Sequence, residues 1–173
     1  MRVSAFRKAV TVDRSNLLER FIEMLRQHGV PFCLIGGQAV NAYVEPVVSL
    51  DLDVVVASDR VAAVEALAAG RFHVERFAHS LNISDSDSDV RIQLQLDPRY
   101  GPFIERAASR RVLDLELPVA ALEDVLQGKI WAVQDDTRRG SKRQKDLADI
   151  ARILESYPSL RPLVSPDVLA RLV

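Results

Sequence analysis

The chain has 173 residues, enough for one ordinary domain with a hydrophobic core. Hydrophobic residues make up 48% and charged residues 27%, which is the balance of a globular protein and excludes a disordered or fibrous one. The formal net charge of -1 gives no reason to expect binding to nucleic acid or to a membrane surface through overall charge. Charge is uneven, however, with an acidic stretch at residues 85–89 and a basic stretch at residues 138–145.

The single cysteine, Cys33, lies in the apolar run of residues 32–35. One cysteine cannot form an internal disulfide or a cysteine metal cage, so the sequence favours a reducing compartment and a buried core thiol. Residues 1–12 lack the apolar core of a signal peptide, and no apolar stretch of about 18 residues could cross a membrane. We therefore expect a cytoplasmic protein with no membrane partner.

The predicted elements alternate between helices and strands before the chain becomes helical. Ser15 is the expected N-cap of a first helix, which Gly29 ends, and Asp59 is the expected cap of a later one. Apolar runs predict strands over residues 32–35, 50–57, 72–77, 90–96 and 113–119. Apolar spacing and composition predict further helices over residues 38–43, 61–69, 122–133, 142–154 and 166–172.

This order of elements is typical of an α/β (α+β) fold, with a mixed sheet followed by C-terminal helices. We expect one domain over residues 1–173, in which a sheet-containing core covers about residues 14–118. A helical part then covers about residues 119–173, because strands give way to helices near Pro118.

Two aspartates open the predicted strand 50–57. Residues two apart in a strand project from the same face, so the carboxylates of Asp51 and Asp53 should lie side by side. Two carboxylates that close repel each other unless water or a cation screens them. Carboxylate oxygens select hard cations, and Mg2+ is commonly held by one or two carboxylates together with substrate phosphates. Asp51 and Asp53 are therefore the candidate ligands for Mg2+ (or Mn2+).

A glycine pair, Gly36-Gly37, separates the predicted strand 32–35 from the helix that follows. Glycine lets the backbone approach a ligand closely, and the N–H groups at a helix start favour an anion such as a phosphate. Alone, a Gly-Gly pair is more often a plain turn, and Asp-x-Asp is more often a solvated strand end. The two motifs together, in this order and with apolar flanks, favour a site for a metal–triphosphate complex.

The pattern of residues 34–53, an apolar-Gly-Gly turn, thirteen further residues and then Asp-x-Asp, resembles the nucleotidyltransferase superfamily that includes polymerase beta. The later segments are similar to the AbiEii branch, the nucleotidyltransferase toxins of type IV toxin–antitoxin systems. That likeness depends on Lys129, in the helix after the sheet, and on the pattern Lys145-Asp146-x-x-Asp149 in the next helix. The resemblance spans about residues 32–154.

The resemblance implies transfer of a nucleotidyl group from an NTP to an RNA or protein acceptor, with an antitoxin protein as a partner. It also implies roles for particular residues. The matching positions are Asp51 and Asp53 for the metal, Gly36 and Gly37 for the triphosphate, and Lys129 and Lys145 for the basic groups that face the phosphates, with Asp146 close by.

One family feature is missing from the expected place. The superfamily usually has a third carboxylate on a later strand, where this chain has Gln93 and Gln95 on the ligand-facing side. An amide can bind a ligand but cannot act as a general base at neutral pH. Asp89 and Asp97 have the same parity but are displaced along the strand by two or more residues, each about 3.3 Å. The chain could therefore be a catalytically degenerate module that binds a nucleotide or a partner.

The basic run from Arg138 to Lys145 admits two interpretations. Several cations on a loop and a helix start attract the phosphates of a nucleic acid such as RNA. The alternative is a solvated helix face whose cations pair with nearby aspartates.

For the function of the chain there is a third hypothesis besides the enzyme and the degenerate binding module. A pure interaction module predicts that neither metal nor nucleotide binds. Trp131 is expected to pack the helix 122–133 against the sheet-containing core.

Overall fold

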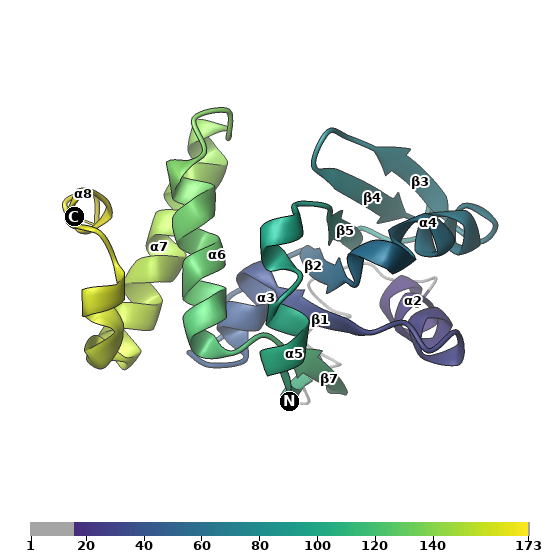
Figure 1. Ribbon diagram of the computed structural model, residues 1–173, viewed down its shortest axis with the longest axis horizontal. Helices are drawn as coiled ribbons and strands as arrows, with labels where there is room; N and C mark the ends of the chain where they lie inside the picture. Colours follow the sequence, from purple (N-terminus) through teal and green to yellow (C-terminus); the bar gives the residue numbers. More distant parts are fainter. Residues whose placement is uncertain (1–15, 173) are drawn as a thin grey trace.

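The computed structural model describes residues 16–172, which form a mixed sheet with helices on both sides (Figure 1). The strands are β1 (Phe32–Ile35), β2 (Asp51–Val56), β3 (His73–Arg76), β4 (Ser80–Ser84), β5 (Arg91–Gln95), β6 (Ala108–Val112) and β7 (Leu115–Val119). The α-helices are α2 (Leu17–Gln27), α3 (Gly36–Asn41), α4 (Val61–Ala69), α5 (Phe103–Arg106), α6 (Leu122–Gln134), α7 (Gly140–Ser156) and α8 (Pro166–Leu169). Short 3₁₀ helices are η1 (Ser58–Arg60), η2 (Pro98–Tyr100) and η3 (Pro158–Leu163).

The seven strands of the described residues lie in the order β3-β4-β5-β2-β1-β7-β6. The central strand β2 runs antiparallel to β1 and parallel to β5, and β1 runs parallel to β7. The mixed α/β sheet that the sequence predicts is therefore confirmed. Because β1, β2 and β5 are neighbours, the register of these three strands brings residues 35, 53 and 93 into one row across the sheet.

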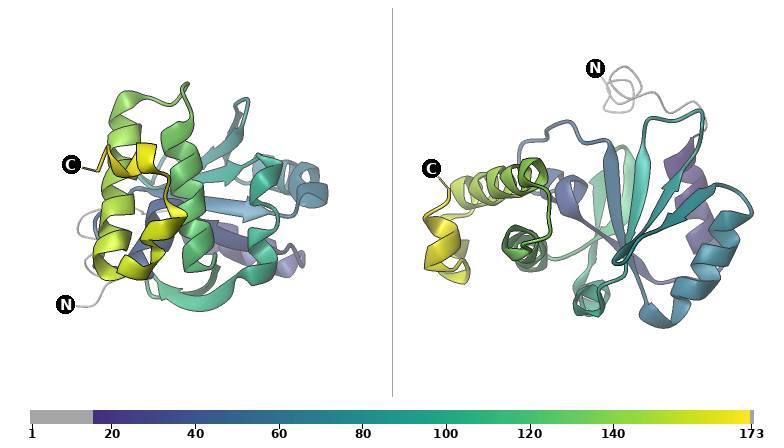
Figure 2. Two further views of the ribbon diagram at one scale, coloured as in Figure 1. Left: turned by 60° about the vertical axis from the view of Figure 1, so that its left-hand side comes forward. Right: turned by 90° about the horizontal axis from the view of Figure 1, so that it is seen from above.

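The two faces of the sheet differ in what covers them. Helices α2 and α4 lie together on one side, whereas α3, α6 and α7 lie on the other (Figure 2). In β2 the burial alternates, with Leu52 and Val54 buried and the two aspartates half-buried. This alternation confirms that Asp51 and Asp53 project from one face, because successive strand residues point to opposite sides.

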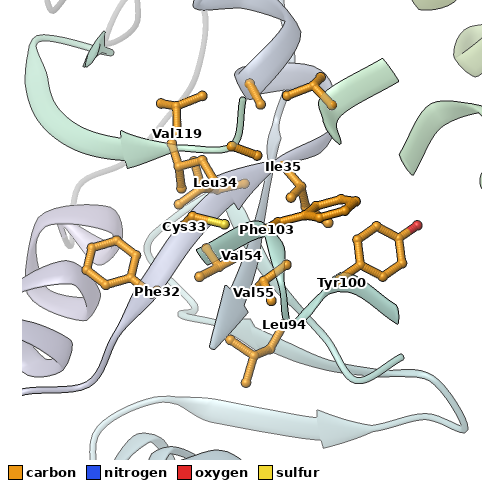
Figure 3. Packing of buried hydrophobic residues seen from close by; sticks show 14 of the residues in the cluster. Phe32, Cys33, Leu34, Ile35, Val54, Val55, Leu94, Tyr100, Phe103 and Val119 are labelled. Atoms are coloured by element: carbon orange, nitrogen blue, oxygen red, sulfur yellow. The ribbon is translucent and has the colours of Figure 1, made fainter. Parts of the chain in front are cut away.

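The core runs from α2 through the sheet to the C-terminal helices. Figure 3 shows its centre, where Tyr100 and Phe103 lie beside Ile35 and Val55. Cys33 belongs to this core and is fully buried, as predicted. Burial raises the pKa of the Cys33 thiol to about 12, so the group stays protonated at neutral pH and is a poor nucleophile.

Several sequence predictions for the helices and strands need correction. Strands β4 and β6 were not predicted, and β6 carries the polar run Ser109-Arg110-Arg111 at the sheet edge. The predicted cap Asp59 is wrong, because it lies inside η1 and the N-cap of α4 is Arg60. Ser15 and residues 1–12 lie outside the described residues, and the N-cap of α2 is Asn16.

The C-terminal helices pack against α3 and against each other. The last strand ends at Val119 and α6 begins at Leu122, close to the predicted boundary. Two hydroxyls fasten this part to the sheet side: Tyr43 donates to the carbonyl of Ala120 at 2.7 Å, and Tyr157 donates to the carbonyl of Tyr43 at 3.0 Å. Within residues 16–172, no helix has both the length and the apolar character needed to span a membrane. The single-domain prediction stays a prediction.

Candidate active site

A cleft of about 410 Å³ lies between the sheet and the pair α6 and α7. It is formed where strand ends and helix faces from distant parts of the chain meet. Six of the nine site residues that the sequence singled out line this cleft: Gly36, Asp53, Gln93, Gln95, Lys129 and Asp146. The other three, Gly37, Asp51 and Lys145, do not line it.

Gly36 and Asp53 are in close contact at the junction of β1 and α3. Ile35 pairs with Asp53 across the two strands, so the next residue, Gly36, meets the aspartate side chain. A Cβ atom at Gly36 would lie 2.1 Å from Asp53 Oδ2, and the φ angle of +71° is one that side-chain-bearing residues rarely adopt. Both facts require glycine here. Gly37 is less constrained, because a Cβ would meet only Ser49 Oγ at 3.4 Å.

The Asp53 carboxylate is half-buried and has no hydrogen-bond or ion-pair partner among residues 16–172. The pKa of Asp53 is raised to about 6, because burial and the neighbouring Asp51 raise it by more than Lys129, Arg138 and Lys142 lower it. An unpaired carboxylate in a partly dehydrated cleft is unfavourable on its own. A bound cation would remove that penalty.

Asp51 has a different environment. Its Oδ1 accepts an ion-paired hydrogen bond from Arg91 Nε on β5 at 3.1 Å, and the Arg91 side chain is 60% exposed. Asp51 lines a separate small cavity together with Gln38 and Ser49. It shares the sheet face of Asp53 but is already paired with a cation.

The residue that faces Asp53 on the neighbouring strand is Gln93. The parallel register pairs Asp53 with Gln93 and Val55 with Gln95, which decides between the two glutamines. Gln93 therefore occupies the sheet position beside the metal-site candidate. Gln95 has a structural task, since its Oε1 accepts the backbone N–H of Asp97 at 3.0 Å.

The two displaced acids do not reach this position. Asp89 is exposed and precedes β5, so it lies before the strand begins. Asp97 lines the cleft but caps η2, where it accepts the backbone N–H of Arg99 and pairs with the Arg99 guanidinium. That pairing lowers the pKa of Asp97. Neither acid is a neighbour of Asp53 on the adjoining strand.

Lys129 on α6 is buried among carboxylates, with 7% of the residue exposed. Its Nζ lies 3.0 Å from Asp146 Oδ1 and 2.8 Å from Asp149 Oδ2, both on α7. Burial lowers the pKa of Lys129, but the two carboxylates outweigh it and the net shift is upward. The Lys-Asp-x-x-Asp pattern thus supplies its two aspartates, spaced one helical turn apart, to hold this ammonium.

Two arginines complete the charge network. Arg138 donates to Asp146 from the cleft side, and Arg152 donates to Asp149 Oδ1 at 2.7 Å. Arg152 also donates to Asn41 Oδ1 at 3.1 Å, which connects α7 to the end of α3. Lys145, by contrast, is exposed on α7 away from the cleft. The network therefore positions Lys129 against the sheet side and leaves Lys145 in solvent.

Sequence reasoning missed several residues that line the cleft. Arg99, Tyr100 and Trp131 form part of its wall, and Trp131 packs against Tyr100 and Phe103 of the sheet-containing core, as expected. The Asp-Pro-Arg turn after β5 was the available signal, because such a turn places an arginine at a strand end.

The donor set for a divalent cation consists of carboxylates on β2. Within the described residues no group of three histidine, cysteine or acidic side chains gathers in a geometry that could hold a metal ion. Asp53 is unpaired and Asp51 shares its face, and this pair of hard oxygen donors fits a cation that takes its remaining ligands from phosphates and water. The residues present therefore fit Mg2+ or Mn2+ bound together with a polyphosphate.

Comparison with protein families gives a direct match. The model of the nucleotidyl transferase AbiEii toxin family, type IV TA system, matches residues 17–173. The chain belongs to this AbiEii family. The match covers nearly the whole sequence, and it confirms the resemblance that the glycine pair, the two aspartates and the C-terminal helices predict.

Solved structures similar to this AbiEii-family chain include several nucleotidyltransferases. ANT(2")-Ia in complex with adenylyl-2"-tobramycin has a TM-score of 0.60 at 14% identity, over 91% of this chain and 98% of that one. The lincosamide antibiotic adenylyltransferase LnuA, lincomycin-bound, has a TM-score of 0.53 at 12% identity, over 83% and 99%. A nucleotidyltransferase-like protein of Thermotoga maritima has a TM-score of 0.51 at 12% identity, over 67% and 82%. Identities this low establish the shared fold only. Comparison with curated protein sequences gives no significant match.

Proposed function

We propose that this AbiEii-family chain is a Mg2+-dependent nucleotidyltransferase that transfers a nucleotidyl group from an NTP to an acceptor in the cytoplasm. The observation that carries the proposal is the unpaired Asp53 carboxylate in contact with Gly36, in one cleft with Lys129. A carboxylate without a partner, a glycine that permits close approach and a buried ammonium together fit a metal–triphosphate complex.

In this proposal each part of the cleft has one task. Asp53 and Asp51 hold the cation, Gly36 leaves room for the Asp53 carboxylate beside the triphosphate, and Lys129 faces the phosphates with its third N–H donor. The acceptor oxygen bonds to the α-phosphorus as the bond to pyrophosphate breaks, and the acceptor's proton passes to water. A bound divalent cation would neutralise charge that develops on the reacting phosphate and the leaving group.

RNA is the acceptor class that the surface charge supports. Four cations at the start of α7, Arg139, Lys142, Arg143 and Lys145, have no ion-pair partner within the described part of the chain. They follow Arg138, which lines the cleft, so a polyanion bound to them would extend to its edge. Such phosphate contacts make binding strongly dependent on salt. The family match supports an antitoxin protein as the binding partner.

The test is transfer of label from α-32P NTPs to RNA, to protein and to small hydroxyl compounds in separate reactions with Mg2+. We expect labelled RNA with the unaltered protein and at least a 100-fold loss with Asp53→Ala. The matched control is Asp59→Ala, which removes an exposed aspartate just beyond the same strand. Equal labelling by the protein and by Asp53→Ala would contradict the proposal.

One observation favours a second function. Gln93 stands beside Asp53, at the position where the superfamily usually has a third carboxylate. Without that acid the fold could bind Mg–NTP, or a partner, and not turn it over. Calorimetry that detects Mg–NTP binding, with no labelling of any acceptor, would support this binding module. Measurable turnover would exclude it.

A further inference from the structure

We propose that the base of a bound nucleotide stacks on the guanidinium of Arg99, which lies over the Trp131 ring and forms with it a platform in the wall of the cleft. This inference rests on the proposed function, since it says where one end of the NTP binds. It concerns residues that neither the metal site nor the phosphate site uses. The argument starts from the geometry of the two side chains.

Arg99 lies over the indole ring of Trp131. The Arg99 Cζ atom is 4.5 Å from the centroid of the Trp131 ring, and both residues line the cleft. The Arg99 side chain is 55% exposed, so its planar guanidinium has surface free to face a ligand. Guanidinium groups and indole rings are the two protein surfaces on which flat, delocalised groups stack best.

The guanidinium is held in place before any ligand arrives. Arg99 Nη2 lies 2.8 Å from Asp97 Oδ2, and Arg99 Nε donates to the same oxygen at 2.9 Å. Asp97 also accepts the backbone N–H of Arg99 at 2.9 Å, and Pro98 restricts the turn between them. A side chain fixed in this way loses little further freedom on binding, which favours affinity.

The indole ring below is equally constrained. Phe103 stacks on Trp131 with a centroid distance of 5.7 Å and an interplanar angle of 8°, and Tyr100 contacts it edge-on at 5.1 Å. The Tyr100 hydroxyl donates to the carbonyl of Gly128 at 3.4 Å, and in Figure 3 it points away from the apolar cluster. The aromatic rings thus come from η2, α5 and α6 and hold one another in place, and Trp131 remains at the cleft wall.

The rest of the cleft indicates which ligand stacks there. The same cavity contains Gly36, Asp53 and Lys129, the groups that suit a metal-bound polyphosphate. A ligand that has an anionic chain and a flat aromatic group fits both regions at once, and a nucleoside triphosphate has both. The volume of about 410 Å³ lies in the usual range for small-molecule sites. Stacking alone tolerates any base, because every base has a π face.

The test uses Trp131, which is the only tryptophan of the chain. Its fluorescence is followed during titration with each of the four NTPs and, separately, with inorganic tripolyphosphate, all with Mg2+. We expect every NTP to quench the fluorescence and tripolyphosphate to leave it nearly unchanged. Tripolyphosphate should still compete with the NTPs, since it shares their phosphate site.

Two arginine variants separate stacking from charge. Arg99→Lys keeps the positive charge but removes the planar face, and we expect about ten-fold weaker NTP binding with tripolyphosphate affinity within about two-fold. Arg110→Lys is the matched control, because Arg110 lies over the Tyr43 ring at 4.0 Å and does not line the cleft. It should leave both affinities unchanged.

Each result of these titrations either supports or contradicts the stacking platform. If tripolyphosphate binds as tightly as the NTPs, or if Arg99→Lys weakens both equally, the platform is wrong while the phosphate site stands. If neither ligand binds with Mg2+, the proposed function fails and the platform with it. Quenching by the NTPs alone, lost selectively in Arg99→Lys, supports the platform.

Discussion

The two walls of the cleft differ in whether their charged side chains have partners within the protein. On the helix wall, Lys129 is buried between Asp146 and Asp149, and each of these aspartates also binds an arginine. On the sheet wall, Asp53 has no hydrogen-bond or ion-pair partner within residues 16–172, and burial raises its pKa to about 6. The charges of the helix wall are therefore paired within the protein, whereas the Asp53 carboxylate of the sheet wall is not.

This difference separates charges that are paired within the protein, with one N–H of Lys129 left for the phosphates, from a carboxylate that is left wholly to a ligand. Buried charges that are fully paired add little net stability but are costly to break singly. A half-buried carboxylate without a partner costs stability in the free protein and is retained only where a ligand uses it. The comparison therefore predicts that substitutions on the helix wall destabilise the protein, whereas those on the sheet wall change binding.

The largest expected effect is that of Lys129→Met. Methionine has a similar length, but it leaves Asp146 and Asp149 buried with one cation fewer each. We expect the free energy of unfolding to fall by about 3 kcal/mol, the lower end for removing one partner of a buried pair, because Arg138 and Arg152 remain. Urea denaturation followed by circular dichroism measures it.

The control for this variant is Lys142→Met, which removes an exposed lysine from the start of α7. Its unfolding free energy should stay within about 0.5 kcal/mol of the unaltered protein. If both variants lose the same stability, the pairing of Lys129 does not brace the helix wall, and the contrast between the two walls is wrong.

The next effect comes from Gly36→Ala, with Gly29→Ala as its control. Both glycines have positive φ angles, +71° and +61°, so alanine costs about 1 kcal/mol of backbone strain at either position. Only at Gly36 would the Cβ also meet the Asp53 carboxylate, 2.1 Å away, whereas nothing lies within 4 Å at Gly29. We expect a total loss of about 2 kcal/mol for Gly36→Ala.

Nucleotide binding gives a second comparison between Gly36→Ala and Gly29→Ala. Gly36→Ala should push the Asp53 carboxylate from its place and abolish Mg–NTP binding in calorimetry, while Gly29→Ala binds normally. Equal binding by the two variants would show that the close approach of Gly36 and Asp53 has no role in the site.

A smaller effect, of opposite sign, is expected for Asp53→Asn in metal-free buffer. Since burial raises the folded-state pKa of Asp53 to about 6, above the unfolded value of 3.8, the folded state binds more protons between these pH values. The contribution of Asp53 to the free energy of unfolding is therefore most favourable below pH about 4 and is lost as the pH rises through about 6. Asparagine is neutral throughout, so the variant should be more stable by about 1–2 kcal/mol at pH 7 and equal at pH 4.

Thermal unfolding in EDTA at several pH values gives this difference. Added Mg2+ and ATP should then stabilise the unaltered protein and not Asp53→Asn, because binding to the folded state alone raises stability. A variant that is less stable at pH 7 would show that the Asp53 carboxylate has a stabilising partner.

The fold was largely predictable because its local signals agree with its tertiary structure. The buried run Phe32–Ile35, the glycine pair and the aspartates of β2 fixed the centre of the sheet, and the apolar spacing of α6 and α7 fixed the helices. Strand β6 was not predictable in the same way. It is an edge strand with four exposed residues, so pairing with β7 and not hydrophobic pattern decides its structure.

The candidate site was predictable only where one motif contains it. Gly36 and Asp53 belong to one local pattern, but the choice of Gln93 over Gln95 depends on the register between two strands. The misplacement of Lys145 has a similar cause, since helix rotation decides which of Lys145 and Asp146 is buried. Arg99 and Trp131 come from segments 32 residues apart, and only their packing shows that they meet.

The smallest expected effect concerns Asp51, the acid of the sheet wall that does have a partner. Its ion pair with Arg91 is exposed, with the arginine 60% and the aspartate 27% accessible, so it contributes about 0.2–1 kcal/mol. Arg91→Gln should therefore leave stability almost unchanged. It should instead release Asp51 from the competing Arg91, so that Asp51 and Asp53 together hold a cation more tightly.

We expect Arg91→Gln to tighten Mn2+ binding by about two- to five-fold, the factor that corresponds to losing a competing pair of this strength. Electron paramagnetic resonance of free Mn2+ measures the affinity, with Arg76→Gln as the control, because its ion pair with Glu65 is also exposed but lies away from the cleft. Weaker Mn2+ binding in Arg91→Gln would mean that Arg91 orients Asp51 as a ligand instead of competing for it. On the sheet wall, Asp51 would then be held in place by its ion pair, and Asp53 would have no partner within residues 16–172. The contrast between the two walls would hold for Asp53 alone.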